Sequence, residues 1–244
     1  SYPKILNDEV VGEQARKVFD DAQKMLRQLV AEKWLTAKGV YGLYPAQTIN
    51  DDEIVLYADA AKTQELLRWN SGRQRTEKQV IDGVKRPNIS LADFVAPQGS
   101  GKSDYVGMFA VTAGLNMESR IEAFEAAHDD YNSIMFKALA DRLVEALAEY
   151  LHEKIRKQDW GYAPEEELSN QELIKEQYQG IRPAPGYPAC PSHEVKTDLF
   201  RVLDANAIGM YLTESLAMWP ASSISGFYFS HPESRYFNVG AQTV

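Results

Sequence analysis

Apolar residues recur at helical spacing in two long stretches of the chain. Between about Asp8 and Lys33 they fall three or four positions apart, which is typical of an amphipathic helix. The second stretch runs from about Met117 to Lys157, and the polar run at residues 128–130 is the point at which it would break. The sequence therefore predicts two long helices, one near the start of the chain and one at its middle.

The remaining apolar runs are short and mostly β-like. A turn-prone Asn-Asp-Asp at residues 50–52 separates two of them, whereas the polar stretch 70–87 is typical of a loop. Because regular alternation of strand and helix is missing, we predict an α+β fold with a largely antiparallel central sheet flanked by helices. The predicted strands cover residues 40–44, 54–57, 90–96, 105–113, 211–214 and 225–230, and the predicted shorter helices cover 61–69, 170–178 and 195–204.

Composition excludes several classes of partner. The chain has 244 residues, 44% of them apolar and 25% charged, which is ordinary for a globular domain. Its formal net charge of −9 argues against a nucleic-acid partner or an anionic membrane surface, because both select clustered Lys and Arg. No apolar stretch reaches the roughly 20 residues of a membrane span. Cys190 is the single cysteine, so no internal disulfide can form and a reducing cytoplasm is the expected setting.

Common catalytic motifs are missing or misplaced. Residues 96–103 resemble a phosphate-binding loop, but a β-like run follows instead of the helix that would hold phosphate, so a hairpin turn is favoured. The Gly-x-Gly-x-x-Gly spacing of a Rossmann site and the Gly-x-Ser-x-Gly elbow of a serine hydrolase are absent. The histidines are too scattered for a metal site, and His128 and His152 are interpreted as solvated or capping residues. Cys190 beside His193 could suggest a thiol nucleophile, but a cysteine between prolines is more typical of apolar filler.

The stretch 182–191, Arg-Pro-Ala-Pro-Gly-Tyr-Pro-Ala-Cys-Pro, has the most distinctive composition in the chain. Its four prolines fix the backbone and remove donors, so the segment is expected to be stiff and extended. Gly186 permits a close ligand approach, Arg182 supplies a planar fork matched to a carboxylate, and Tyr187 offers an aromatic face. These features suit a zwitterionic ligand with a flat base. They suit equally a rigid linker or a non-enzymatic protein-interaction module that binds a partner through the proline-rich segment.

The same stretch is similar to the S-adenosylmethionine motif in the C-terminal activation domain of cobalamin-dependent methionine synthase. Five further blocks match that domain in the same order and span nearly the whole chain, which is far more specific than one motif. The resemblance implies that residues 1–244 form this domain, expected to be truncated at both ends. The blocks are Leu91-Ala92-Asp93-Phe94-Val95-Ala96-Pro97, His128-Asp129-Asp130-Tyr131-Asn132, Trp160-Gly161-Tyr162-Ala163-Pro164, Leu212-Thr213-Glu214-Ser215 and Tyr228-Phe229-Ser230-His231-Pro232.

The resemblance also implies a function. The domain would bind S-adenosylmethionine for the reductive methylation of cob(II)alamin, which reactivates methionine synthase, the methyltransferase that converts homocysteine to methionine. The implied partners are the cobalamin-binding domain of the same enzyme, which holds the cobalamin, and flavodoxin or a flavodoxin-like reductase, which supplies the electron. Because the nucleophile is then the cofactor, we expect no catalytic residue and no metal ligand in this chain. The isolated chain is expected not to be catalytic without the cobalamin module.

Nine positions match ligand-binding positions of the family. Arg182 matches the arginine for the methionine carboxylate, and Glu145 and Glu176 match acidic residues that would favour the sulfonium cation. For both glutamates a solvated helix face is the alternative. In the family, an aspartate for the ligand's amino group precedes the equivalent of Ser1, and its loss would weaken binding by about 1.5–3 kcal/mol. The other matched positions meet the ligand through backbone (Ala184, Gly186, Ala189) or through aromatic rings (Tyr187, Tyr236, Phe237).

Overall fold

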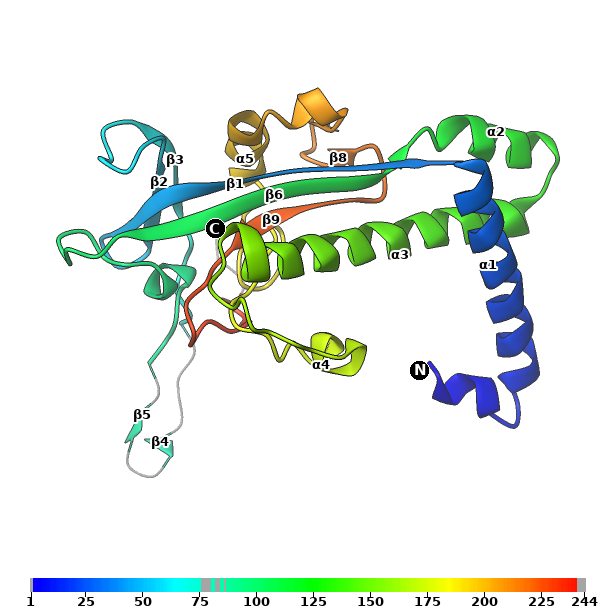
Figure 1. Cartoon of the computed structure of the whole chain (residues 1–244), viewed down its shortest axis with the longest axis horizontal. Helices are drawn as coiled ribbons and strands as arrows, with labels where there is room; N and C mark the ends of the chain where they lie inside the picture. Colours follow the sequence, from blue (N-terminus) through cyan, green and yellow to red (C-terminus); the bar gives the residue numbers. More distant parts are fainter. Residues whose placement is uncertain (1, 76–79, 82–83, 86, 241–244) are drawn as a thin grey trace.

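A five-stranded antiparallel sheet forms the centre of the structure, a computed structural model that describes residues 2–75, 80–81, 84–85 and 87–240 (Figure 1). Its strand order is β3-β2-β1-β6-β9, which confirms the predicted α+β class and antiparallel sheet. The strands are β1 (Thr36–Ile49), β2 (Glu53–Tyr57), β3 (Glu65–Asn70), β6 (Asp104–Leu115) and β9 (Ser223–Tyr228). Outside this sheet, β4 (Val80–Ile81) pairs with β5 (Val84–Lys85), and β7 (Tyr211–Leu212) pairs with β8 (Met218–Trp219).

Both predicted long helices are present. Asp129 marks the expected break in the second one, since its carboxylate accepts a hydrogen bond from the Asn132 backbone N–H (3.1 Å) and caps α3. A π-helical turn, Ile155–Asp159, follows α3 directly. The α-helices are α1 (Gly12–Glu32), α2 (Glu118–Ala126), α3 (Asp130–Lys154), α4 (Asn170–Ile174) and α5 (Val195–Leu203). Short 3-10 helices cover Lys4–Asn7, Leu91–Phe94 and Ala205–Ile208.

Helices cover both faces of the central sheet. Side chains alternate between the two faces of a strand, so Met108 and Ala110 of β6 join the core cluster that includes α5. Phe109 and Val111 instead join the cluster that includes α3. Figure 1 shows the same division, with α3 along one face and α5 on the other. A strand covered on both faces is apolar at successive positions, which explains the run of residues without polar side chains from Val106 to Val111 in β6.

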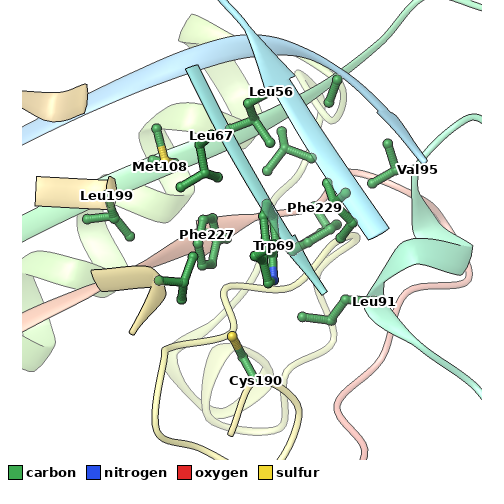
Figure 2. Packing of buried hydrophobic residues seen from close by; sticks show 14 of the residues in the cluster. Leu56, Leu67, Trp69, Leu91, Val95, Met108, Cys190, Leu199, Phe227 and Phe229 are labelled. Atoms are coloured by element: carbon green, nitrogen blue, oxygen red, sulfur yellow. The ribbon is translucent and has the colours of Figure 1, made fainter. Parts of the chain in front are cut away.

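The core cluster on the α5 side lies between the sheet and the segment that carries Cys190 (Figure 2). Trp69 of β3 stacks on Phe227 of β9, with ring centroids 4.6 Å apart. Cys190 is only 2% exposed, and burial raises the pKa of its thiol to about 12. A thiol with so high a pKa is not a nucleophile near neutral pH. Cys190 is therefore the apolar filler that the sequence favours.

The predicted helix at residues 61–69 is wrong. Residues Glu65–Asn70 form strand β3, which pairs with β2. Leu67 and Trp69 are buried while Arg68 between them is exposed, a period of two that places both apolar side chains on one face of the sheet. Pairing with β2 and stacking on Phe227 thus override the local helix pattern.

The predicted strand at residues 90–96 is also wrong. Ser90 and Asp93 form a capping box, in which the Ser90 hydroxyl accepts from the Ala92 N–H (3.2 Å) and the Asp93 carboxylate accepts from the Ser90 N–H (2.9 Å). These two bonds close the 3-10 helix Leu91–Phe94. Strand β8 was not predicted, because it is two residues long and has no apolar alternation of its own.

Three further predictions hold only in part. Residues 96–103 lead into strand β6 and not into a helix, so the phosphate-loop alternative lacks the helix N-terminus that it requires. The hairpin turn favoured for this segment is wrong, because a 3-10 helix precedes it in place of a strand and Pro97 bridges Thr48 of β1 in parallel. A capping box formed by Ser169 and Glu172 begins α4 at Asn170, where the predicted helix 170–178 begins, although α4 ends at Ile174. Within the predicted loop 70–87, β4 pairs with β5, so the loop prediction is wrong at residues 80–81 and 84–85. Residues 76–79, 82–83 and 86 lie outside the described part of the chain.

Candidate functional site

The proline-rich segment begins as an extra edge on the central sheet. Ile181 pairs with Phe229, just beyond β9, through two backbone hydrogen bonds of 3.0 Å. The Pro183 carbonyl then accepts a hydrogen bond from the Phe227 N–H (2.9 Å). A proline has no N–H, so only its carbonyl can join such pairing. The expected extended conformation is therefore confirmed for residues 181–184, and Arg182 lies within this extended part.

The second half of the segment turns back on itself, so the expectation of a continuous extended strip is wrong for residues 185–190. Gly186 has φ +90°, a region that L-residues rarely adopt, and its N–H donates to the Cys190 carbonyl (2.8 Å). The Tyr187 N–H donates to the Ala184 carbonyl (3.2 Å). A Cβ on Gly186 would lie 2.1 Å from the His193 ring. Glycine is therefore needed both for the backbone angle and for the space.

A pocket of about 590 Å³ opens beside these turns. Its volume falls within the ~300–1,000 Å³ usual for small-molecule sites. Tyr187 is 67% exposed and Tyr236 is 38% exposed, so aromatic rings stand at the solvent-accessible part of the pocket. The pocket is lined by Glu176, Arg182, Ala184, Tyr187, Ala189, Tyr236 and Phe237 from the sequence-based set, together with Pro183, Pro188 and Asn238.

Two of the nine sequence-based positions do not line this pocket. Gly186 shapes the turn beneath it, as described above. Glu145 lies on α3, where its exposed carboxylate forms an ion pair with Arg142 (2.9 Å). The residue one helical turn further along the same face of α3 is Glu149, which reaches the site itself. On this face of α3, Glu149 and not Glu145 contacts a residue that lines the pocket.

The guanidinium of Arg182 is held by three side chains outside the sequence-based set, Glu149, Tyr178 and His152. Its Nη2 donates to Glu149 Oε2 (2.7 Å), and its Nη1 lies 3.1 Å from the Tyr178 hydroxyl and 3.2 Å from His152 Nδ1. Its backbone N–H donates to the Tyr236 hydroxyl (3.0 Å). Burial disfavours the charged guanidinium, but Tyr178 and Glu149 outweigh it and hold the pKa of Arg182 above its ordinary value.

The interpretation of His152 as a solvated or capping residue is wrong. The side chain is fully buried between two tyrosines, stacked on Tyr228 (5.1 Å) and edge-on to Tyr178 (5.0 Å). Its spacing was a usable signal, because positions 145, 149 and 152 of α3 form one stripe at helical spacing that continues to position 156 in the π-helical turn. His128, by contrast, is exposed at the junction of α2 and α3.

Behind this group lies a buried ion pair. Arg156 has no exposed side-chain surface and donates three hydrogen bonds of 2.7–3.0 Å to the Glu166 carboxylate. Its guanidinium also lies over the Tyr178 ring, 4.3 Å from the ring centroid. The pair connects the π-helical turn after α3 to the following loop, and so holds the Arg156 guanidinium in place against the Tyr178 ring.

Among residues 2–75, 80–81, 84–85 and 87–240, no cluster of three or more His, Cys, Asp or Glu side chains could hold a metal ion. Within the same ranges, no helix is both long and apolar enough to cross a membrane.

Comparisons with known proteins agree on one family. The sequence matches the family described as vitamin B12-dependent methionine synthase, activation domain, over residues 1–243. The structure is similar to the crystal structure of the MetH reactivation domain bound to AdoHcy, with a TM-score of 0.90 and 56% sequence identity. That match covers 98% of this chain and 72% of the other. The chain therefore belongs to the activation-domain family of vitamin B12-dependent methionine synthase.

Proposed function

We propose that the chain binds S-adenosylmethionine in the pocket beside residues 182–191, and that it presents this ligand for the reductive methylation of cob(II)alamin. The observation that carries the proposal is the meeting, in one pocket, of the Arg182 guanidinium, the Glu176 carboxylate and the aromatic rings of Tyr187, Tyr236 and Phe237. The similar domain of known structure is bound to AdoHcy, the demethylated form of the same ligand.

The residues present fit a ligand with a carboxylate, a positive centre and a flat base. Within the described part of the chain, no residue accepts a hydrogen bond from Nε of Arg182, so this N–H is available to a ligand carboxylate. Glu176 supplies negative charge toward a sulfonium or an ammonium group. The aromatic rings offer flat faces to adenine, while Ala184 and Ala189 leave room for the ligand to approach the backbone.

This arrangement binds and orients without acid–base chemistry. When cobalamin is held by the neighbouring module, its cobalt supplies the nucleophile that accepts the methyl group. The chain's own contribution is to hold the ligand with its methyl group accessible. Arg182 would fix one end of the ligand and the aromatic rings the other, while the exposed Tyr187 faces the side from which a partner module would dock.

The proposal includes partners and setting. The cobalamin-binding domain of the same enzyme would dock over the pocket, and flavodoxin or a flavodoxin-like reductase would supply the electron, in the cytoplasm. Separated from the cobalamin module, the chain would bind its ligand without turning over. The family membership of the chain and the accessible pocket support this assignment.

Thermal unfolding of the chain tests the proposal. S-adenosylmethionine at about 100 times its dissociation constant should stabilise the folded chain by roughly 2.7 kcal/mol. For a domain of this size, that corresponds to a rise of about 5–11 °C in melting temperature. Adenosine and methionine, added separately or together, serve as controls because they lack the sulfonium. An unchanged melting temperature at saturating S-adenosylmethionine would contradict the proposal.

A further inference from the structure

The guanidinium of Arg182 is anchored on the side away from Glu149. Two neutral acceptors reach Nη1, the Tyr178 hydroxyl at 3.1 Å and His152 Nδ1 at 3.2 Å. Glu149 Oε2 accepts a hydrogen bond from Nη2 (2.7 Å). With Nη1 engaged on these two groups, Nε and the second N–H of Nη2 remain as the edge with which the fork can grip another carboxylate.

The protonation state of His152 follows from its partner. A guanidinium only donates hydrogen bonds, so Nδ1 of His152 must be the unprotonated, accepting nitrogen and the proton sits on Nε2. Burial, with smaller contributions from Arg156 and Arg182, holds the pKa of His152 well below its ordinary value of 6.5. The imidazole is therefore neutral when it accepts from Arg182.

The imidazole is also fixed in orientation. It lies flat on the Tyr228 ring, with an interplanar angle of 16°, and edge-on to the Tyr178 ring, at 79°. No part of the side chain reaches solvent. Tyr228 is fully buried as well, so neither ring can turn without disturbing the core between α3 and the sheet.

Glu149 provides an alternative position for the fork. Its Oε1 is buried and has no hydrogen-bond partner in the described part of the chain, while Oε2 already accepts from Nη2 of Arg182. A two-pronged pair between a guanidinium and a carboxylate is stronger than a single bond. If Nη1 were released, the guanidinium could turn so that Nη1 and Nη2 close on both oxygens of Glu149, which would carry the Nε–Nη2 edge away from the pocket.

We propose that His152 and Tyr178 are positioning residues that hold the Arg182 fork open toward the pocket, and so set the preference of the site for a ligand that carries a carboxylate. The inference rests on the proposed function, since it concerns the same pocket. It adds two buried side chains that lie behind Arg182 and do not line the pocket.

The test compares two ligands that differ by one group. S-adenosylmethionine carries the carboxylate, whereas decarboxylated S-adenosylmethionine keeps the sulfonium, the amino group and the adenosine. Isothermal titration calorimetry on the 244-residue chain gives the ratio of their dissociation constants. The variants are Tyr178→Phe, which removes only the hydroxyl, His152→Leu, which removes the acceptor, and His152→Asn, whose amide oxygen can replace Nδ1.

Each variant has a distinct expected result. Tyr178→Phe and His152→Leu should weaken S-adenosylmethionine binding roughly tenfold each, because one hydrogen bond to a charged group is lost. Binding of the decarboxylated ligand should change less than about twofold, so the preference ratio falls by nearly the same factor. His152→Asn should restore most of the ratio. If His152→Leu does not fold, Tyr178→Phe alone can test the inference, because it keeps the aromatic ring that packs against His152.

Several outcomes would overturn the inference. Equal weakening of both ligands would mean that His152 and Tyr178 merely maintain the fold. Unchanged affinity for both ligands would mean that Arg182 needs neither side chain. If the parent chain binds S-adenosylmethionine and the decarboxylated ligand equally tightly, Arg182 does not recognise the ligand carboxylate and the inference is wrong. A parent chain that binds neither ligand would instead contradict the proposed function.

Discussion

Substitution of Gly186 by alanine perturbs the turn that shapes the pocket. Gly186 has φ +90°, and the new Cβ would lie 2.1 Å from Cε1 and 2.7 Å from Nδ1 of His193. The substitution therefore introduces two costs at one position, an unfavourable backbone angle and the displacement of an exposed ring. Its effect should appear both in stability and in ligand affinity, because Ala184 and Tyr187 on either side of the turn line the pocket.

The expected magnitude follows from these two costs. A positive φ costs an L-residue about 1–2 kcal/mol, and the lower flexibility of the unfolded chain returns about 0.4–1 kcal/mol. The backbone cost alone is therefore about 0–1.6 kcal/mol. Displacing the His193 ring adds about 1–3 kcal/mol, as in other overpacked sites. In total, Gly186→Ala should lower the free energy of unfolding by about 1–5 kcal/mol.

A matched control separates the two costs. Gly99 has φ +81°, and a Cβ built there meets nothing within 4 Å, so Gly99→Ala carries the backbone cost without a clash. Urea denaturation followed by circular dichroism gives the free energy of unfolding for both variants and for the double variant Gly186→Ala/His193→Ala. The double variant, compared with His193→Ala, should lose no more stability than Gly99→Ala does. If Gly186→Ala is no more destabilising than Gly99→Ala, the argument from the His193 contact fails.

Two further predictions concern the buried groups behind the pocket. Arg156→Met leaves the Glu166 carboxylate, whose side chain is 9% exposed, without its partner, so the free energy of unfolding measured by urea denaturation should fall by about 3–5 kcal/mol. The double variant Arg156→Met/Glu166→Leu should recover most of this loss. A loss below about 1 kcal/mol in the single variant would contradict the prediction. His152 should make stability depend on pH. Because its pKa is lowered in the folded state, the unfolded chain binds more protons below about pH 6.5, so stability is full above that pH and falls as the pH decreases toward the folded-state pKa. Urea denaturation between about pH 8 and pH 5.5 should show this loss, at up to about 1.4 kcal/mol per pH unit, in the parent but not in His152→Asn, and equal slopes would refute it.

The sequence pattern correctly predicted the elements whose apolar residues follow the period of the element that they form. α1 and α3 carry apolar residues at helical spacing, and β6 is covered on both faces, so each shows its pattern directly. The prediction at β3 was wrong because pairing with β2, a contact outside the segment itself, decides its conformation. The prediction at residues 90–96 was wrong for a local reason, since the Ser90–Asp93 capping box closes a 3-10 helix where a strand was predicted.

The candidate site shows a similar division. Residues that form the pocket wall lie mostly in one contiguous motif, so a sequence resemblance could locate Arg182, Ala184 and Tyr187 together. The side chains that hold Arg182 come from α3 and from the loop after α4. The two on α3, Glu149 and His152, precede Arg182 by 33 and 30 positions in the sequence. Only the fold brings them together. Glu149 and His152 were therefore missed, although their spacing on α3 already placed them on one face.

The central claim is that Arg182 binds the ligand carboxylate in this pocket. Calorimetric titration of S-adenosylmethionine into the parent chain, Arg182→Lys and Arg68→Lys tests it most directly. Arg182→Lys keeps the charge but loses the fork, and Arg68, which pairs with Glu65 and Glu53 on β3 and β2, is a matched control outside the pocket. We predict saturable binding to the parent and to Arg68→Lys, weakened at least about tenfold in Arg182→Lys. No heat of binding in the parent chain, or equal affinity in all three, would contradict the account.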